Sequence, residues 1–178
     1  MNIQIGPHAA IRDKVSKKAA RRISMTPTTE AVPAMTEFHV AIGDVTTFSK
    51  TVGETDVYLF AGITGDFSPN HTNQVYMERS IFGRRQAHGA LLVGFISTVS
   101  TLAIAHCRDD ETETPVAVGF DRVRFLRPVY LGDTITVTYT IAAIDMTKRR
   151  STADVEIHNQ DGVLVAVAQH LLQWVANA

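Results

Sequence analysis

The chain has 178 residues, the length of one ordinary domain, which leaves little room for a separate cofactor-binding domain. Seventeen Lys and Arg residues against eighteen Asp and Glu residues give a formal net charge of −1, and 45% of the residues are hydrophobic. This composition argues against a largely disordered chain and against a polybasic nucleic-acid-binding protein. The single cysteine, Cys107, cannot form an intramolecular disulfide, so we expect a reducing, cytoplasmic location and no structural metal.

Residues 1–34 differ from the rest of the chain, because they carry six basic residues against two acidic ones and then a Thr- and Pro-rich stretch. We predict a loosely ordered extension over this segment and a single domain over residues 35–178. A contact with nucleic acid or a membrane, or an amphipathic targeting helix, is the alternative for the basic arm.

The first elements of the domain are predicted to be a short strand and a helix. Residues 46–52 have a strand-like pattern, and Thr51-Val52-Gly53-Glu54 has the form of a capping box at a helix start. In that helix Val57, Phe60 and Ala61 would share one face.

Residues 89–107 contain no charged side chain, and the segment is almost long enough to cross a bilayer. Ser97, Thr98, Ser100 and Thr101 lie at its middle, and no second such segment follows, which argues against insertion. We expect instead a long buried helix, which a curved antiparallel sheet would wrap.

The second half of the chain is predicted to form strands. Apolar and Thr residues alternate over residues 134–141, the period expected when one face of a sheet is buried. Another strand is predicted over residues 116–129, with a bulge where the apolar phase slips between Phe120 and Val123.

A hairpin follows at the end of the chain. Apolar and polar residues alternate over residues 152–157, residues 159–162 supply a turn, and residues 163–168 are wholly apolar. The last run predicts a strand buried on both faces. With residues 46–52, the sheet would contain about five strands.

Two ionisable side chains lie in the segment Gly65-Asp66-Phe67-Ser68-Pro69-Asn70-His71. Pro69 prevents one regular helix from carrying both, so Asp66 and His71 can turn toward one point. A carboxylate and an imidazole that share one water supply a base and an acid near neutral pH. A capping role for Asp66 and a structural role for His71 is the alternative.

The sequence Ala87-His88-Gly89 comes directly before the apolar helix. The unpaired N–H groups and the positive dipole end of a helix N-terminus can bind an oxyanion such as a thioester enolate. Glycine also lets a substrate carbonyl approach the main chain closely. We expect His88 to be a structural or supporting residue.

Together, Gly65-Asp66-Phe67-Ser68-Pro69-Asn70-His71 and Ala87-His88-Gly89-Ala90-Leu91 resemble the signature of the MaoC-like dehydratases, which include (R)-specific enoyl-CoA hydratases. The resemblance extends from about Thr46 to Val175. It implies an α+β hotdog fold, in which a curved antiparallel sheet wraps a long central helix. It also implies that Asp66 and His71 are the catalytic pair and that the N–H of Gly89 is the oxyanion donor.

Some positions depart from the family pattern. Ser68 replaces the usual Asn but can still form hydrogen bonds in the loop, whereas Met77 and Gly94 are expected to alter the acyl pocket. Asn73 stands where an acidic residue is frequent. We predict that substrate is bound by Ser68, His88, Gly94 and Arg124. The candidates for binding the carrier phosphates are Arg122, Arg124 and Arg127, or Arg84 and Arg85, and a solvated sheet face is the alternative for these arginines.

The resemblance implies reversible addition of water to an enoyl thioester, giving an (R)-3-hydroxyacyl thioester, in fatty acid metabolism. The substrate would be carried by CoA or an acyl-carrier protein, and no metal or redox cofactor is needed. A thin sheet around one helix leaves apolar surface to cover, so we expect a homodimer. An acyl thioesterase and a non-catalytic acyl-thioester-binding protein are the alternatives.

Overall fold

The computed structural model describes residues 38–109 and 111–178, which belong to one compact unit. The extension predicted over residues 1–34 lies outside the described residues. The elements are, in chain order, β1 (Val45–Thr51), α1 (Glu54–Thr64), α2 (Pro69–Thr72), α3 (Gln74–Met77), α4 (Gly89–Ala103), the 3₁₀ helix η1 (Ala105–Cys107), β2 (Glu113–Phe125), β3 (Thr134–Asp145), β4 (Arg150–Asn159) and β5 (Leu164–Ala176).

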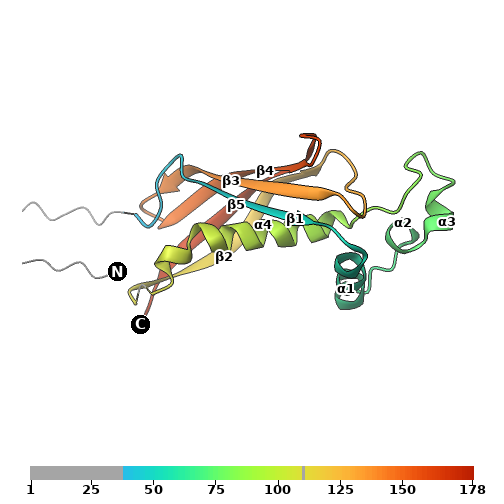
Figure 1. Cartoon of the computed structure of the whole chain (residues 1–178). Coiled ribbons are helices and arrows are strands. Elements are labelled where there is room, and N and C mark those ends of the chain that lie inside the picture. Colours follow the sequence, from blue (N-terminus) through green and yellow to red (C-terminus); the bar gives the residue numbers. More distant parts are fainter. Residues whose placement is uncertain (1–37, 110) are drawn as a thin grey trace, which may run out of the picture. The chain divides into compact units, whose positions relative to one another are not determined.

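The five strands form one antiparallel sheet in the order β1-β3-β4-β5-β2. Helix α4 runs along one face of this sheet and contacts β1 and β3, while α1, α2 and α3 extend from one end of the sheet (Figure 1). The predicted combination of a long helix and a curved antiparallel sheet of five strands is therefore confirmed.

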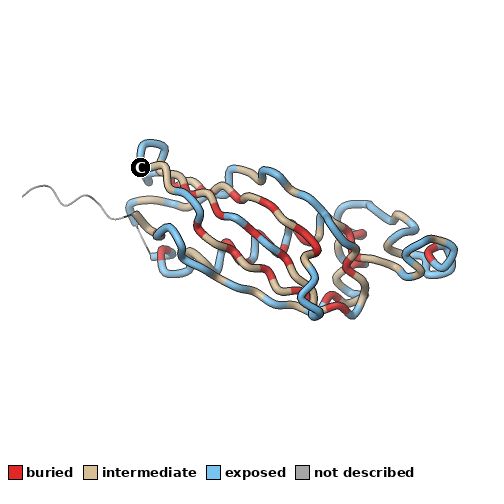
Figure 2. Tube along the Cα trace, turned by 90° about the horizontal axis from the view of Figure 1, so that it is seen from above, coloured by how far each residue is buried: buried red, intermediate tan, exposed pale blue. Residues whose placement is uncertain are grey.

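The core lies between the sheet and α4, and the alternating pattern of the strands creates it. On β3, Ile135, Val137, Tyr139 and Ile141 are buried, while the Thr residues between them are only half-buried. Buried residues recur at alternate positions on β4 and along most of β5 as well (Figure 2), so one face of the sheet is buried. Pairing in this register turns that face toward α4.

Helix α4 is covered on one side only by the described residues. Leu92, Phe95, Ile96 and Val99 are buried, and the Phe95 ring lies 6.3 Å from that of Phe48 on β1. The opposite side is exposed and carries most of the small and polar residues of the helix, Gly94, Ser97, Thr98 and Thr101. The described part of the chain contains no helix that is both long and apolar enough to span a membrane.

The predicted start of the first helix is wrong by two residues. Thr51 is the last residue of β1, where it pairs with Thr134, and the two hydroxyl oxygens lie 2.7 Å apart. The helix instead begins at Glu54, and the Gly53 N–H donates to the Asp56 carboxylate at 2.9 Å. Strand pairing therefore takes precedence over the local capping motif. The shared face is confirmed, since Val57 and Ala61 are buried.

The bulge predicted between Phe120 and Val123 is confirmed. The register of β2 against β5 shifts between Asp121 and Arg124, and Arg122 has a left-handed φ of 53°. The predicted strand end at residue 129 is wrong, because β2 ends at Phe125. The chain leaves the ladder there, since the N–H groups of both Leu126 and Arg127 donate to the single carbonyl of Val165.

Residues 163–168 are predicted to form a strand that is buried on both faces. The structure buries only some of these residues, so this prediction is wrong in part. Val165, Ala166 and Ala168 are buried, whereas Val167 is half-buried and Val163 is exposed. Val165, Ala166 and Ala168 belong to the hydrophobic core, whereas Val163 and Val167 do not. An apolar run alone does not distinguish these environments.

A buried histidine makes the stability of the fold depend on pH. The Tyr139 hydroxyl and Nδ1 of His170 form a hydrogen bond of 2.9 Å, and His170 has no exposed surface. Burial lowers the pKa of His170 from its ordinary value near 6.5 to about 4. The unfolded chain therefore binds this proton more readily than the folded one. The contribution of neutral His170 to the free energy of unfolding is complete above about pH 6.5 and is lost as the pH falls toward 4.

We expect the wild-type protein to lose roughly 2–3 kcal/mol more unfolding free energy than His170→Asn between pH 7 and pH 4.5. Asn does not titrate, and its amide oxygen can still accept from Tyr139. Urea unfolding at both pH values measures the difference. His158→Asn, at a half-exposed position on β4, is the control and should follow the wild type. Parallel pH dependence of wild type and His170→Asn would contradict this account.

Gly94 should tolerate a side chain. It lies inside α4 with an ordinary φ, and a Cβ there would meet no atom of the described residues within 4 Å. We expect Gly94→Ala to raise the unfolding free energy by roughly 0.5–1 kcal/mol, because Ala favours helix more than Gly does. Gly162→Ala is the control, since that site is equally open but has a φ of +72°, and it should destabilise. A destabilised Gly94→Ala protein in urea unfolding would show that this helix face is covered.

Candidate active site

Asp66 and His71 are placed by the end of α1 and by the proline that begins α2. Gly65 has a left-handed φ of 79°, and its N–H donates to the Ala61 carbonyl, which ends α1. Pro69 occupies the first position of α2. Between them, the Ser68 N–H donates to the Asp66 carboxylate at 3.2 Å. The loop therefore turns sharply after Asp66.

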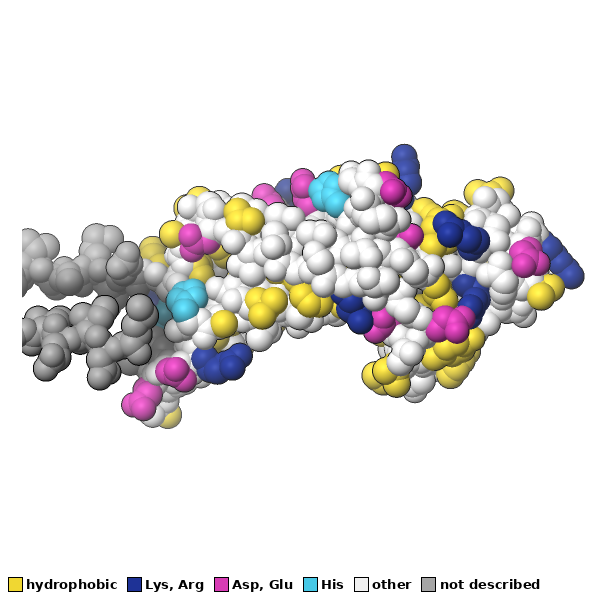
Figure 3. Space-filling model, in the orientation of Figure 1, with side chains coloured by type: hydrophobic (Ala, Val, Ile, Leu, Met, Phe, Trp, Pro, Cys, Tyr) yellow, Lys and Arg dark blue, Asp and Glu magenta, His cyan; other side chains and the backbone are white. Residues whose placement is uncertain are grey.

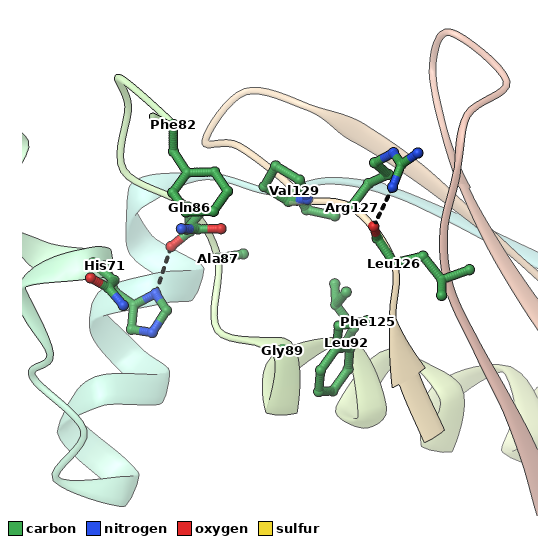
Figure 4. A pocket seen from close by; sticks show the side chains of 12 residues that line it. His71, Phe82, Gln86, Ala87, Gly89, Leu92, Phe125, Leu126, Arg127 and Val129 are labelled. Carbon is green, nitrogen blue, oxygen red and sulfur yellow. Dashed lines mark hydrogen bonds between the residues drawn. The ribbon is translucent and has the colours of Figure 1, made fainter. Parts of the chain in front are cut away.

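His71 is fixed by the segment that precedes α4. Its Nδ1 donates to the main-chain carbonyl of Gln86 at 2.7 Å, which is the dashed line beside His71 in Figure 4. The Gln86 N–H in turn donates to the Asn70 carbonyl at 3.1 Å. Because a carbonyl oxygen only accepts, the proton lies on Nδ1 and the Nε2 lone pair of the neutral ring is available for chemistry.

The surroundings of His71 favour its neutral form. Burial lowers the pKa of His71 from its ordinary value, and the nearby His88 lowers it as well. The Gln86 carbonyl and the negative charge of Asp66 act in the opposite direction, but the resulting pKa is still lowered. A histidine in this state can take up a proton from water at neutral pH.

The fold brings Asp66, His71 and His88 together. A carboxylate oxygen of Asp66 and one ring nitrogen of each histidine all lie within 4.8 Å of one another. Two atoms less than about 6 Å apart can both form hydrogen bonds to a single water molecule. The Asp66 side chain is 52% exposed, whereas His88 is 2% exposed, so water reaches the group from the Asp66 side.

These three residues are also the metal-ligating group that the described part of the chain offers. Their geometry suits a metal ion poorly. The rings of His71 and His88 are stacked with centroids 3.7 Å apart and planes 29° apart, so their in-plane lone pairs cannot both point at one ion. The His88 Nε2–H is also engaged with the Asp66 carbonyl.

A cavity of about 340 Å³ lies between His71 and the N-terminus of α4. Gly89 lines it at the first position of the helix, and the ring of Phe125 lies beside Gly89 (Figure 4). Among the described residues, no acceptor takes a hydrogen bond from the Gly89 N–H. The full lining is Asn70, His71, Phe82, Gln86, Ala87, Gly89, Leu92, Phe125, Leu126, Arg127, Pro128 and Val129.

Other residues that the sequence analysis linked to substrate binding do not line this cavity. Ser68 is half-buried and holds the loop through main-chain hydrogen bonds, which any residue could form. Gly94 is exposed on α4, Met77 is buried in α3, and neither lines the cavity. Arg124 is exposed and donates to the Val123 carbonyl, outside the lining.

Two features of the site were not expected from the sequence. One is the carbonyl of Gln86, which fixes His71, and a main-chain group leaves no signal in residue types. The other is Phe125, whose ring would lie 2.6 Å from a Cβ at position 89. The only sequence signal for Phe125 is its place at the end of an apolar strand.

The comparison with protein families identifies the group to which these features belong. A family model described as "MaoC like domain" matches residues 21–163, which is more than half of the sequence. The chain belongs to this family. The residues that carried the resemblance, from Gly65 to Leu91, lie inside the matched region.

Named relatives of this MaoC-like chain agree with the assignment. An (R)-specific enoyl-CoA hydratase from Rhodospirillum rubrum is 36% identical over 103 residues, which cover 57% of this chain and 66% of that relative. The chain therefore spans slightly less than two thirds of that relative's length.

Two solved structures are also similar. The "Monoamine oxidase regulatory protein from Archaeoglobus fulgius" has a TM-score of 0.68 and 31% identity, over 78% of this chain and 92% of that one. The (R)-hydratase of A. caviae has a TM-score of 0.65 and 25% identity, over 75% and 96% of the two chains. The predicted hotdog fold is confirmed.

The contact between Gly89 and Phe125 predicts a coupling between these two positions. Gly89→Ala should destabilise by about 1 kcal/mol, because the new Cβ overlaps the Phe125 ring. In a Phe125→Ala background the same change should be neutral or stabilising, since Ala favours helix more than Gly. A double-mutant cycle in urea measures this coupling. Additive effects of the two substitutions would show that the ring does not restrict position 89.

Proposed function

We propose that this MaoC-like chain catalyses reversible addition of water to the double bond of an enoyl thioester, yielding an (R)-3-hydroxyacyl thioester. The observation that carries the proposal is the approach of the Asp66 carboxylate and a His71 ring nitrogen to within 4.8 Å. His71 also lines the cavity that Gly89 closes at the N-terminus of α4. The similarity to named (R)-specific hydratases supports the same reaction.

In the hydration direction, one water molecule lies between Asp66 and His71. Its oxygen bonds to the β-carbon of the thioester while one of the two side chains takes up its proton. The other side chain delivers a proton to the α-carbon, so water is consumed and no other reactant is needed. A proton passed back between the two groups, directly or through solvent, restores the starting state. Either side chain can act as the base, with the other as the acid.

During the addition, negative charge develops on the thioester oxygen. The Gly89 N–H donates to no acceptor among the described residues, and it lies at the positive end of the 15-residue helix α4. A hydrogen bond made to the enolate oxygen is stronger in the transition state than in the substrate, so it lowers the barrier. Removal of a single donor of this kind lowers kcat by about 10²–10³-fold.

The size and lining of the cavity suit an acyl group. Its volume of about 340 Å³ lies at the low end of the range for small-molecule sites. Leu92, Phe125 and Val129 supply apolar walls. We propose that the acyl chain of a CoA or acyl-carrier thioester lies there. Arg127, which also lines the cavity, is a nearer candidate for the carrier phosphates than Arg124.

We further propose that the protein works as a homodimer in the cytoplasm, in fatty acid metabolism. The helical end of the described chain exposes large apolar side chains, which gather over α1 in Figure 3. A second copy of the chain would cover them. The exposed large hydrophobic residues from α1 to the loop after α3 are Tyr58, Leu59, Ile63, Phe67, Val75, Tyr76, Ile81 and Phe82.

The test is hydration of crotonyl-CoA, followed by loss of the enoyl absorbance. We expect Asp66→Asn and His71→Ala each to lower kcat by at least about 10²-fold, because each removes one partner in the proton transfers. Matched controls are Asp161→Asn in the β4–β5 turn and His158→Ala on β4, and both should keep wild-type rates. Circular dichroism checks that each variant is folded.

The same assay separates the alternative functions. Release of free CoA without formation of the hydroxyacyl product would indicate a thioesterase. Binding of acyl-CoA that survives His71→Ala, without turnover of crotonyl, longer or branched enoyl thioesters, would indicate a binding protein. Either result would contradict the proposed hydration.

A further inference from the structure

His88 connects the Asp66–His71 pair to the N-terminus of α4. Its side chain is 2% exposed, and it contacts both Asp66 and His71. Its main chain is the N-cap of α4 and leads directly into Gly89. A change at His88 therefore acts on the acid–base pair and on the oxyanion donor at once.

The contact with Asp66 is a hydrogen bond to the main chain. Nε2 of His88 donates to the Asp66 carbonyl at 2.9 Å, and the same nitrogen lies 3.9 Å from the Asp66 carboxylate. Because the carbonyl only accepts, the proton of this ring lies on Nε2. The bond holds the main chain of the exposed loop at the residue that carries the carboxylate.

The contact with His71 is a ring stack. The two ring centroids lie 3.7 Å apart, and the Phe60 ring of α1 lies 4.8 Å from His88. His88 therefore lies in contact with the aromatic rings of both α1 and α2. The stack sets the plane of the His71 imidazole, while the Gln86 carbonyl sets its rotation.

The arrangement is not the one that stability alone favours. Nδ1 of His88 is buried and has no hydrogen-bond partner among the described residues, and such an atom disfavours folding. A phenylalanine would fill the same space without a buried polar atom. A phenylalanine would leave the Asp66 carbonyl without its donor, the Nε2–H of His88. Because Asp66 is exposed, a water molecule can donate to this carbonyl instead. A polar ring at this position is thus better explained by activity than by packing.

We infer that His88 is a positioning residue, which fixes Asp66, His71 and Gly89 relative to one another through its Nε2–H bond to the Asp66 carbonyl and its stack on His71. The inference rests on the proposed hydration. Because the geometry matters most in the transition state, loss of His88 should lower kcat more than it raises KM.

Two variants separate the ring from the donor. His88→Phe keeps an aromatic ring and removes the donor, whereas His88→Gln removes the ring and can place an amide N–H near the position of Nε2. With crotonyl-CoA, we expect His88→Phe to lower kcat by about 10–100-fold with KM within about threefold of wild type. Its melting temperature should not fall. His88→Gln should recover part of the lost kcat even if it melts lower. His158→Phe and His158→Gln are the controls and should keep wild-type kinetics.

The outcomes that would overturn the inference differ from those for the function. His88→Phe with kcat within threefold of wild type would show that the donor has no positioning role. If His88→Phe lowers both kcat and the melting temperature, and His88→Gln recovers no activity, His88 is a packing residue and not a positioning residue. A wild-type protein that hydrates no enoyl thioester would instead overturn the proposed function, and the inference with it.

Discussion

The hydrogen bond from His71 to the Gln86 carbonyl is the interaction on which the site depends. It joins the one-turn helix α2 to the segment that enters α4, and so it connects the two halves of the candidate site. It also sets the tautomer of His71, because a carbonyl cannot donate. The lone pair that remains on Nε2 is what allows the imidazole to act as a base. Without this bond, His71 would be a partly buried histidine on a short surface helix.

The hotdog fold holds this bond in place from both sides. The Ala87 N–H donates to the Val129 carbonyl, which ties the segment before α4 to the segment between β2 and β3. Helix α4 is held against the sheet by its buried face. The rigid part of the fold thus carries Gly89, the proposed oxyanion donor, and the acceptor for His71, while Asp66 lies on an exposed loop. His88 links that loop to the rigid part.

The sequence was sufficient to predict the sheet, because alternation over residues 134–141 leaves one register that buries the apolar side. It was also sufficient to bring Asp66 and His71 together, because Pro69, the first residue of α2, prevents one helix from carrying both. The helix start at Thr51 was wrong, since local capping competes with strand pairing that only the fold reveals. Main-chain acceptors and contacts between distant segments, such as that of Phe125 with Gly89, cannot be derived from residue types.

The central claim is that the thioester oxygen binds the Gly89 N–H while the β-carbon faces the Asp66–His71 pair. A crystal structure of the Asp66→Asn variant with crotonyl-CoA tests it most directly. The account predicts the thioester oxygen about 3 Å from the Gly89 nitrogen, and the double bond beside His71. It is contradicted if the acyl group occupies the separate cavity near Cys107 and Thr114, or if the thioester oxygen points away from α4.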